Sequence, residues 1–160
     1  MIIKFSELHL KVGEEIGTSN WLEITQERID KFAEATGDYQ WIHVDVERAN
    51  REIGGTIAHG YLIISLIPVF FNECLQIEGM SRIVNFGSDR IRLKNAVKTG
   101  SRVRLKQVCE SVKNSAGGKI VKIKNTIEIE GEKRPALVGE TLQILYGAEL
   151  ETQKSDTDAV

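Results

Sequence analysis

Cysteine is scarce in this sequence, and that scarcity limits both the chemistry and the compartment of the protein. Only Cys74 and Cys109 occur among the 160 residues, and neither belongs to a Cys-x-x-Cys pair or a Cys/His cluster. A disulfide framework or a zinc site needs such groupings, so the sequence predicts neither. Two free thiols are typical of a reducing compartment, and we therefore expect a cytoplasmic protein that holds no metal.

Other signatures of familiar chemistries are absent as well. The sequence contains no Gly-rich phosphate loop, no GxSxG turn and no internal repeat. These absences argue against P-loop nucleotide chemistry, serine hydrolysis on a strained turn and repeat architectures. The opening residues, MIIKFSELHLKVGEE, also lack the basic start, apolar core and small-residue cleavage site of a secretory signal.

The composition is otherwise ordinary for one folded domain. Hydrophobic residues make up 41% and charged residues 28% of the chain, which is typical of globular proteins. From Met80 to Lys124, however, twelve basic residues accompany only Asp89 and Glu110. This asymmetry either attracts an anionic ligand or nucleic acid, or places Lys and Arg on the outer face of strands. We predict a single domain over residues 1–148 and a polar, disordered tail over residues 149–160.

A helix is predicted between Thr25 and Gly37. Thr25 is a favourable N-cap, apolar residues recur at i, i+3 and i+4 from Ile29, and Gly37 supplies the stop. Asp38 follows directly, where the negative end of the helix dipole and partial burial both raise the pKa of a carboxyl group. Such a carboxyl suits proton transfer. The alternative is an ordinary turn residue after a glycine.

His43 lies five residues after Asp38. On one helix the two side chains would diverge and on one strand they would face opposite sides, so only a loop brings them together. A structural histidine with satisfied hydrogen bonds is the alternative. Asp45 is then expected to cap a short helix from Val46 to about Glu52, which Gly54-Gly55 ends.

The longest apolar segment runs from Ile57 to Phe71. As a helix it would span roughly 22 Å, which is short for crossing a bilayer. Its apolarity on all sides predicts a helix that a curved sheet wraps around. Pro68 is expected to bend or shorten its second half. Gly60, near its start, offers a free main-chain amide and no side chain, so a ligand oxygen can approach closely.

Strands dominate the second half of the sequence. The segment Lys119 to Glu130 alternates between apolar and charged residues, with a slip of phase near Asn125. Turns that contain glycine separate the segments, and the pattern predicts an antiparallel sheet with one solvent-exposed face. The predicted strands are Arg82 to Leu93, Arg102 to Val112, Lys119 to Glu130 and Ala136 to Tyr146.

These motifs carry a family resemblance. The segments ATGDYQWIH and GGTIAHG, followed by VNFGSDRIRL and VKTGSRVRL, resemble the MaoC-like, or (R)-specific enoyl-CoA hydratase, family and its nodulation-protein-N-like branch. The resemblance extends from Trp21 to Tyr146. It implies an α+β hotdog fold, in which an antiparallel β-sheet wraps around a long central α-helix. Gln40-Trp41 departs from the Asn-Pro of many family members, which leaves the choice of substrate open.

The resemblance also implies an activity, the reversible addition of water to trans-2-enoyl thioesters. Asp38 and His43 would hold and activate the water, and the amide of Gly60 would polarise the thioester carbonyl. We interpret His59 as a structural residue or a supporting neighbour of the site. The expected substrate contacts are Gly55, Ser65, Asn85, Arg90 and Arg92.

The expected ligand is an acyl-CoA or acyl-carrier thioester, with coenzyme A present only as part of the substrate and no other cofactor. A single hotdog sheet leaves an exposed edge, so we expect a homodimer or a higher homo-oligomer. We expect neither a nucleic-acid nor a membrane partner. Two alternatives remain. Hydrolysis of the thioester is one, although residues 57–72 contain no carboxylate. The other is a non-catalytic dimer that binds acyl thioesters.

Overall fold

The computed structural model describes residues 1–115 and 117–148. Its main sheet is antiparallel, with the strand order β2-β6-β7-β8-β5 and the short β3 paired beside β2 on β6. The predicted tail, residues 149–160, lies outside the described residues. The strands of this sheet are β2 (Glu15–Thr18), β3 (Leu22–Glu23), β5 (Met80–Leu93), β6 (Arg102–Ser115), β7 (Gly118–Ile129) and β8 (Leu137–Gly147).

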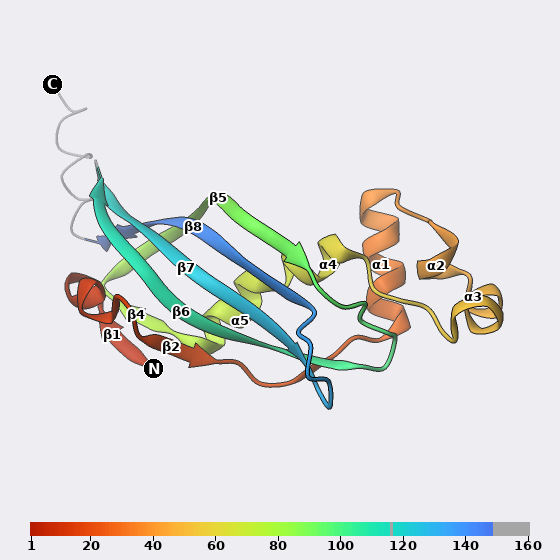
Figure 1. Ribbon diagram of the computed structural model, residues 1–160. Helices are drawn as coiled ribbons and strands as arrows, with labels where there is room; N and C mark the ends of the chain where they lie inside the picture. Colours follow the sequence, from red (N-terminus) through yellow and green to blue (C-terminus); the bar gives the residue numbers. More distant parts are fainter. Residues whose placement is uncertain (116, 149–160) are drawn as a thin grey trace, which may run out of the picture.

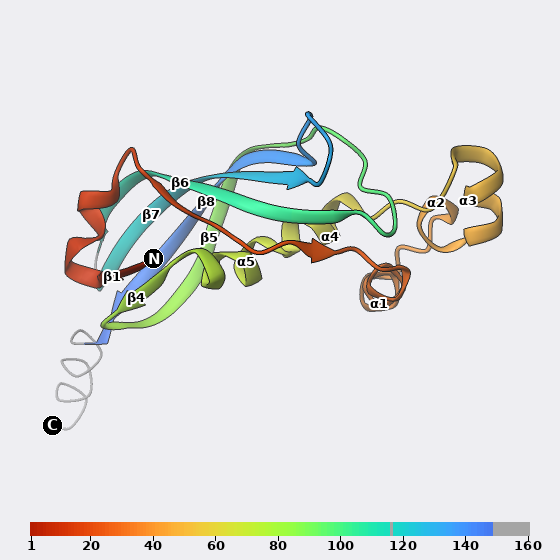
Figure 2. The same ribbon diagram turned by 90° about the horizontal axis from the view of Figure 1, so that it is seen from below.

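Two helices, α4 (Gly60–Ser65) and α5 (Ile67–Cys74), lie against one face of this sheet (Figures 1 and 2). Three further helices form a group beyond one end of the sheet: α1 (Gln26–Thr36), α2 (Trp41–Val44) and α3 (Val46–Ile53). Near the other end, β1 (Ile2–Lys4) and β4 (Gln76–Glu78) form a parallel pair beside the 3-10 helix η1 (Phe5–Lys11). The architecture is the predicted hotdog fold.

The four predicted long strands are present, each within a few residues of its expected bounds. The predicted slip of phase near Asn125 is wrong. Asn125 is fully buried and in phase with buried Ile123 and Ile127, and its side-chain oxygen accepts a hydrogen bond of 2.7 Å from Gln107. The core therefore contains a polar contact between two buried amide side chains, although the Gln107 side-chain oxygen has no partner among the described residues. The irregularity of pairing lies on the neighbouring strand, between Cys109 and Ser111.

The central helix is interrupted close to Pro68, as predicted, because it is broken at Leu66 into α4 and α5. Pro68 occupies the first turn of α5, where its missing N–H removes no hydrogen bond, contrary to the expected cause. The predicted burial on all sides is wrong, because Tyr61 is 77% and Val69 54% exposed. The opposite side of both helices packs into the core against the sheet.

The basic stretch from Met80 to Lys124 is largely part of the sheet, and at least five of its twelve basic residues form ion pairs with other residues that the structure describes. Arg104 pairs with Glu128 of the neighbouring β7, and Arg102 pairs with Glu130, the residue that follows β7. This arrangement favours the interpretation of these charges as the solvated face of the sheet. Among the described residues, no helix combines the length and the apolarity needed to cross a membrane.

Both cysteines are free and buried. Burial raises the pKa of the Cys74 thiol to about 11, and the nearby Glu73 carboxylate adds to the shift. Because the thiolate is the reactive form, we expect native protein at about pH 8 to react with a thiol reagent far more slowly than protein unfolded in urea. The burst of labelling on unfolding measures this difference. Rapid labelling of both thiols in the native protein would contradict it.

Candidate active site

Asp38 is positioned by the end of α1. Gly37 adopts the left-handed conformation, with φ of 77°, and its amide donates to the Ala33 carbonyl at 2.8 Å, which closes the helix as predicted. Thr25 caps the opposite end, also as predicted, by accepting from the Arg28 amide. The chain leaves the helix at Asp38, whose side chain is exposed. The expected partial burial of this carboxylate is therefore wrong for the isolated chain.

His43 lies on α2, a single helical turn, and is 6% exposed. Its Nδ1 is 2.7 Å from the main-chain oxygen of Ile57. A carbonyl oxygen only accepts, so Nδ1 carries the proton and Nε2 of the neutral ring has a free lone pair. Asp45 ends this turn and caps α3 through the Arg48 amide at 3.0 Å, as predicted. The contact with Ile57 thus sets the tautomer that a general base needs.

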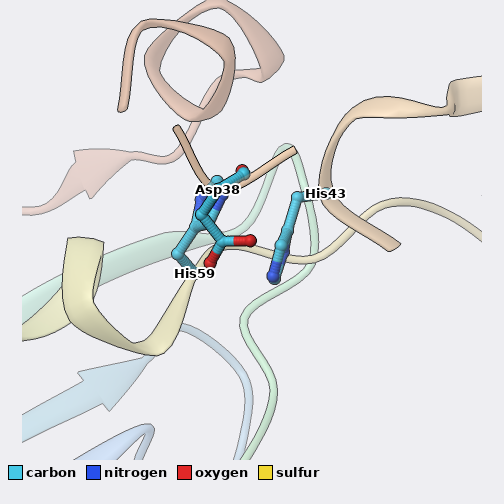
Figure 3. Close-up of side chains that lie close together, drawn as sticks. All are labelled: Asp38, His43 and His59. Carbon is cyan, nitrogen blue, oxygen red and sulfur yellow. Dashed lines mark hydrogen bonds between the residues drawn. The ribbon is translucent and has the colours of Figure 1, made fainter. Parts of the chain in front are cut away.

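The link between α1 and α2 brings Asp38 and His43 together, as the resemblance implies. One oxygen of the Asp38 carboxylate and one ring nitrogen from each of His43 and His59 all lie within 4.8 Å of one another. Figure 3 shows the Asp38 carboxylate turned toward the His43 ring. The spacing leaves room for a small molecule such as water to contact both groups.

His59 lies closer to this pair than its sequence position alone indicates. Its ring is 2% exposed and stacks on the His43 ring with a centroid distance of 3.8 Å. Its Nε2 is 2.9 Å from the main-chain oxygen of Asp38. The residue is thus a supporting neighbour of the site, as the sequence indicated, and it touches both members of the pair.

A partly buried polar network behind His43 was missed by sequence reasoning. The Gln26 side-chain nitrogen donates to the His43 main-chain oxygen at 2.8 Å. The Gln26 side-chain oxygen accepts from Thr56 at 2.5 Å and from Thr99 at 3.2 Å. The network ties α1, α2 and two loops together. No local motif announces it, because Gln26 and Thr99 lie 73 positions apart in the chain.

The three clustered side chains form a donor set that zinc or iron could in principle use, but their orientation does not favour a metal. The rings of His43 and His59 are stacked with an angle of 26° between their planes. The lone pairs of ring nitrogens lie in the ring planes, so those of two stacked rings run side by side instead of converging on one ion at about 2 Å. The arrangement suits proton transfer better than metal coordination.

A cavity of about 310 Å³ adjoins His43, whereas Asp38 is not among the residues that line it. His43 and Gly60 both line it, and most of the remaining wall is apolar. The amide of Gly60 is the first of α4, where it has no partner within the helix. The site therefore combines a base, a main-chain donor and an apolar chamber. The other lining residues are Ile57, Ala58, Ile63, Leu93, Lys94, Asn95, Ala96, Val97 and Ala136.

The predicted substrate contacts are not gathered in this cavity. Ser65 and Asn85 line a second cavity, of about 360 Å³, at the other end of α4. Arg90 has a positive φ of 53° and pairs with Glu140 at 3.4 Å. Arg92 donates to the main-chain oxygen of its neighbour Ile91, and Gly55 donates to Ala49 in the turn after α3. Neither arginine nor Gly55 lines either cavity.

Comparison with known proteins identifies the family. Residues 7–132 match the family model described as the MaoC-like domain, and the chain belongs to this family. The 3-hydroxyacyl-thioester dehydratase Z of Mycobacterium tuberculosis is 38% identical over 139 residues, which cover 86% of this chain and 92% of that protein.

Nodulation protein N of Rhizobium leguminosarum bv. viciae is 40% identical over 147 residues, which cover 89% of this chain and 91% of that protein. Among solved structures, the unliganded R-hydratase of Pseudomonas aeruginosa superposes with a TM-score of 0.69 at 20% identity, covering 85% of this chain and 82% of the other. This last likeness concerns the fold.

Proposed function

We propose that the protein catalyses the reversible hydration of trans-2-enoyl thioesters to (R)-3-hydroxyacyl thioesters, with acyl-CoA as the substrate class. The cavity that His43 and Gly60 share, with the Asp38 carboxylate turned toward His43, is the observation that carries the proposal. The similarity to a 3-hydroxyacyl-thioester dehydratase supports it. The (R) configuration follows the name of the structural neighbour.

In this mechanism the acyl chain occupies the apolar cavity with its carbonyl oxygen at the Gly60 amide. Asp38 accepts a hydrogen bond from the water and orients it toward C3 of the substrate. The unprotonated Nε2 of His43 takes a proton from the water as the C–O bond forms. The Gly60 amide stabilises the enolate-like oxygen, and the imidazolium returns the proton to C2. One water is added across the double bond, and the enzyme ends in its starting state.

Hydrolysis of the thioester is the alternative reaction. Thioesterases of this fold would need a carboxylate near the central helix, and α5 does extend far enough to include Glu73. That carboxylate accepts from the Asn20 amide at 2.9 Å, at the end of the helix pair opposite to Gly60. It does not line the cavity that holds His43. The position of Glu73 therefore favours hydration over hydrolysis.

One assay separates the candidates. Purified protein is mixed with crotonyl-CoA, and the loss of the conjugated enoyl absorbance is followed beside the release of free thiol. We expect loss of absorbance without thiol, and chiral analysis should identify the (R)-3-hydroxy product. Thiol release would mark hydrolysis. Saturable binding of crotonyl-CoA with neither change would mark a binding protein without activity.

We further propose that the working form is a cytoplasmic homodimer that pairs through β5. This strand is an edge of the sheet, and none of its fourteen residues is buried. Phe86 is 59% exposed, and it borders the second cavity together with Ser65 and Pro68 of the central helices. A long exposed edge strand invites a second strand, and pairing would cover the Ser65 and Asn85 cavity. The two free, buried thiols suit a reducing compartment.

A charge at Phe86 tests this interface. We expect light scattering at micromolar concentration to report a dimer for the wild type and a monomer for Phe86→Asp, because pairing would bury the new carboxylate. Val12→Asp is the matched control, since Val12 is also exposed but lies outside β5, and it should remain dimeric. A wild type that is monomeric and active would refute the dimer.

A further inference from the structure

His59 contacts the main chain of one member of the pair and the ring of the other. Its Nε2 approaches the Asp38 main-chain oxygen at 2.9 Å, and its ring covers the His43 ring at 3.8 Å. Phe32 of α1 packs near the His59 ring, with centroids 5.0 Å apart. His59 directly precedes Gly60. The two neighbouring residues 59 and 60 therefore contact Asp38 and His43 through His59 and supply the main-chain amide of Gly60.

The partners of the two stacked rings give them opposite tautomers. Because the carbonyl of Asp38 accepts, the proton of neutral His59 sits on Nε2, whereas the proton of neutral His43 sits on Nδ1. The Nδ1 of His59 is buried and has no hydrogen-bond partner among the described residues. A proton on that nitrogen would be a buried donor without an acceptor. The contacts therefore fit the Nε2–H tautomer of His59.

Asp38 has few other restraints. Its side chain is exposed, and two long hydrogen bonds involve this residue. The Asp38 amide donates to Thr36 Oγ1 at 3.4 Å, and the Gln40 amide donates to the Asp38 carboxylate at 3.4 Å. The bond from buried His59 is shorter, and it comes from a residue fixed at the start of α4. Of these three hydrogen bonds at Asp38, the short one is the bond that its main-chain oxygen accepts from His59.

We propose that His59 is a positioning residue, which holds Asp38 at its working distance from His43 through the hydrogen bond from Nε2 to the Asp38 main-chain oxygen. This inference rests on the proposed hydration for its kinetic consequence. It assigns His59 no contact with the substrate and no proton transfer. Its effect should appear in the rate of the chemical step, because misplacing a catalytic group by about 1 Å costs up to ~100-fold.

Two substitutions separate the hydrogen bond from the ring. His59→Phe keeps an aromatic ring over His43 but removes the donor, and we expect kcat to fall about 10- to 100-fold with little change in KM. His59→Gln places an amide N–H near the position of Nε2, and it should recover most of that loss. His59→Met is a second donor-free variant if the phenylalanine variant does not fold. Thermal unfolding is measured for each.

Phe32→Leu is the matched control. It alters the packing of the same ring but leaves the hydrogen bond to Asp38, so we expect a lower Tm and a kcat close to that of the wild type. Normal kcat in a folded, donor-free variant would overturn the proposal. An equal loss in the glutamine and phenylalanine variants would also overturn it, since the ring and not its donor would then matter.

The tautomer gives a readout that does not need turnover. The protein has three histidines, so nitrogen NMR of the imidazoles is simple to assign. At a pH about 2 units above the ordinary histidine pKa of ~6.5, we expect the Nε2–H form for His59 and the Nδ1–H form for His43. Exposed His9 serves as the internal reference. If His59 is in the Nδ1–H form, the hydrogen bond from its Nε2 to Asp38 does not exist and the positioning role is refuted. If the spectrum is as expected but the wild-type protein does not hydrate crotonyl-CoA, only the proposed function is rejected.

Discussion

Asp38→Asn and a substitution that removes the base at His43 should each lower the rate of crotonyl-CoA hydration by at least ~100-fold, with the fold retained. This is the low end expected when general acid–base assistance is lost. Asparagine keeps the shape of Asp38 but loses the charge that orients water. His43→Asn retains an amide donor near the position of Nδ1, for the bond to the Ile57 oxygen, but supplies no basic nitrogen. His43→Gln should lose the same activity.

Asp45→Asn is the matched control for this pair. Asp45 lies two residues after His43 and caps α3 through an oxygen that asparagine also has. It should therefore leave both the rate and the Tm close to those of the wild type. If folded Asp38→Asn, or a folded His43 variant, turns over at a near-normal rate, that residue does not take part in the chemistry.

Periodicity and capping predicted much of the fold. Alternation along β7 is strict from Val121 to Ile129 in the structure, because one face of the strand packs into the core. Thr25 and Asp45 act as caps, and Gly37 and Gly54 end their helices in the left-handed conformation, as the sequence indicated. These features are local, so short segments are sufficient to predict them.

The errors arise where tertiary contacts decide. Asn125 looked like a break in the pattern because its buried partner, Gln107, lies on another strand. Residues 57–71 looked like one buried helix because an exposed apolar face, which includes Tyr61, cannot be distinguished from a core face by composition.

The site was predictable only in part. A spacing of five residues does not by itself bring Asp38 and His43 together, and the family resemblance supplied that expectation. The structure adds the reason, since Gly37 ends α1 and the one-turn α2 then directs His43 back toward the carboxylate. The contacts of His59 and Gln26 depend on segments far apart in sequence, and no local pattern could have indicated them.

Gly60→Val should abolish most turnover while Asp38 and His43 remain in place. Gly60 lines the same cavity as His43, and a Cβ built there overlaps the Cδ1 atom at the end of the Leu93 side chain. Leu93 is 53% exposed, so it can move aside, and we expect the variant to fold. The added methyl groups then occupy the approach to the amide. Loss of one such donor costs about 3 kcal/mol in the transition state, or roughly 100-fold in rate.

A Leu93→Ala background separates the amide from the crowding. The loss of rate could arise only because the new side chain pushes Leu93 into the cavity. In that case Gly60→Ala should be slow alone. It should regain the normal rate when combined with Leu93→Ala, because the smaller alanine leaves room for the new Cβ. If the amide itself is the catalytic donor and the side chain covers it, Gly60→Val should stay slow in both backgrounds, with a Tm close to that of its parent. A stable Gly60→Val protein with normal rate constants would exclude the amide from the mechanism, because no ligand oxygen could then depend on it.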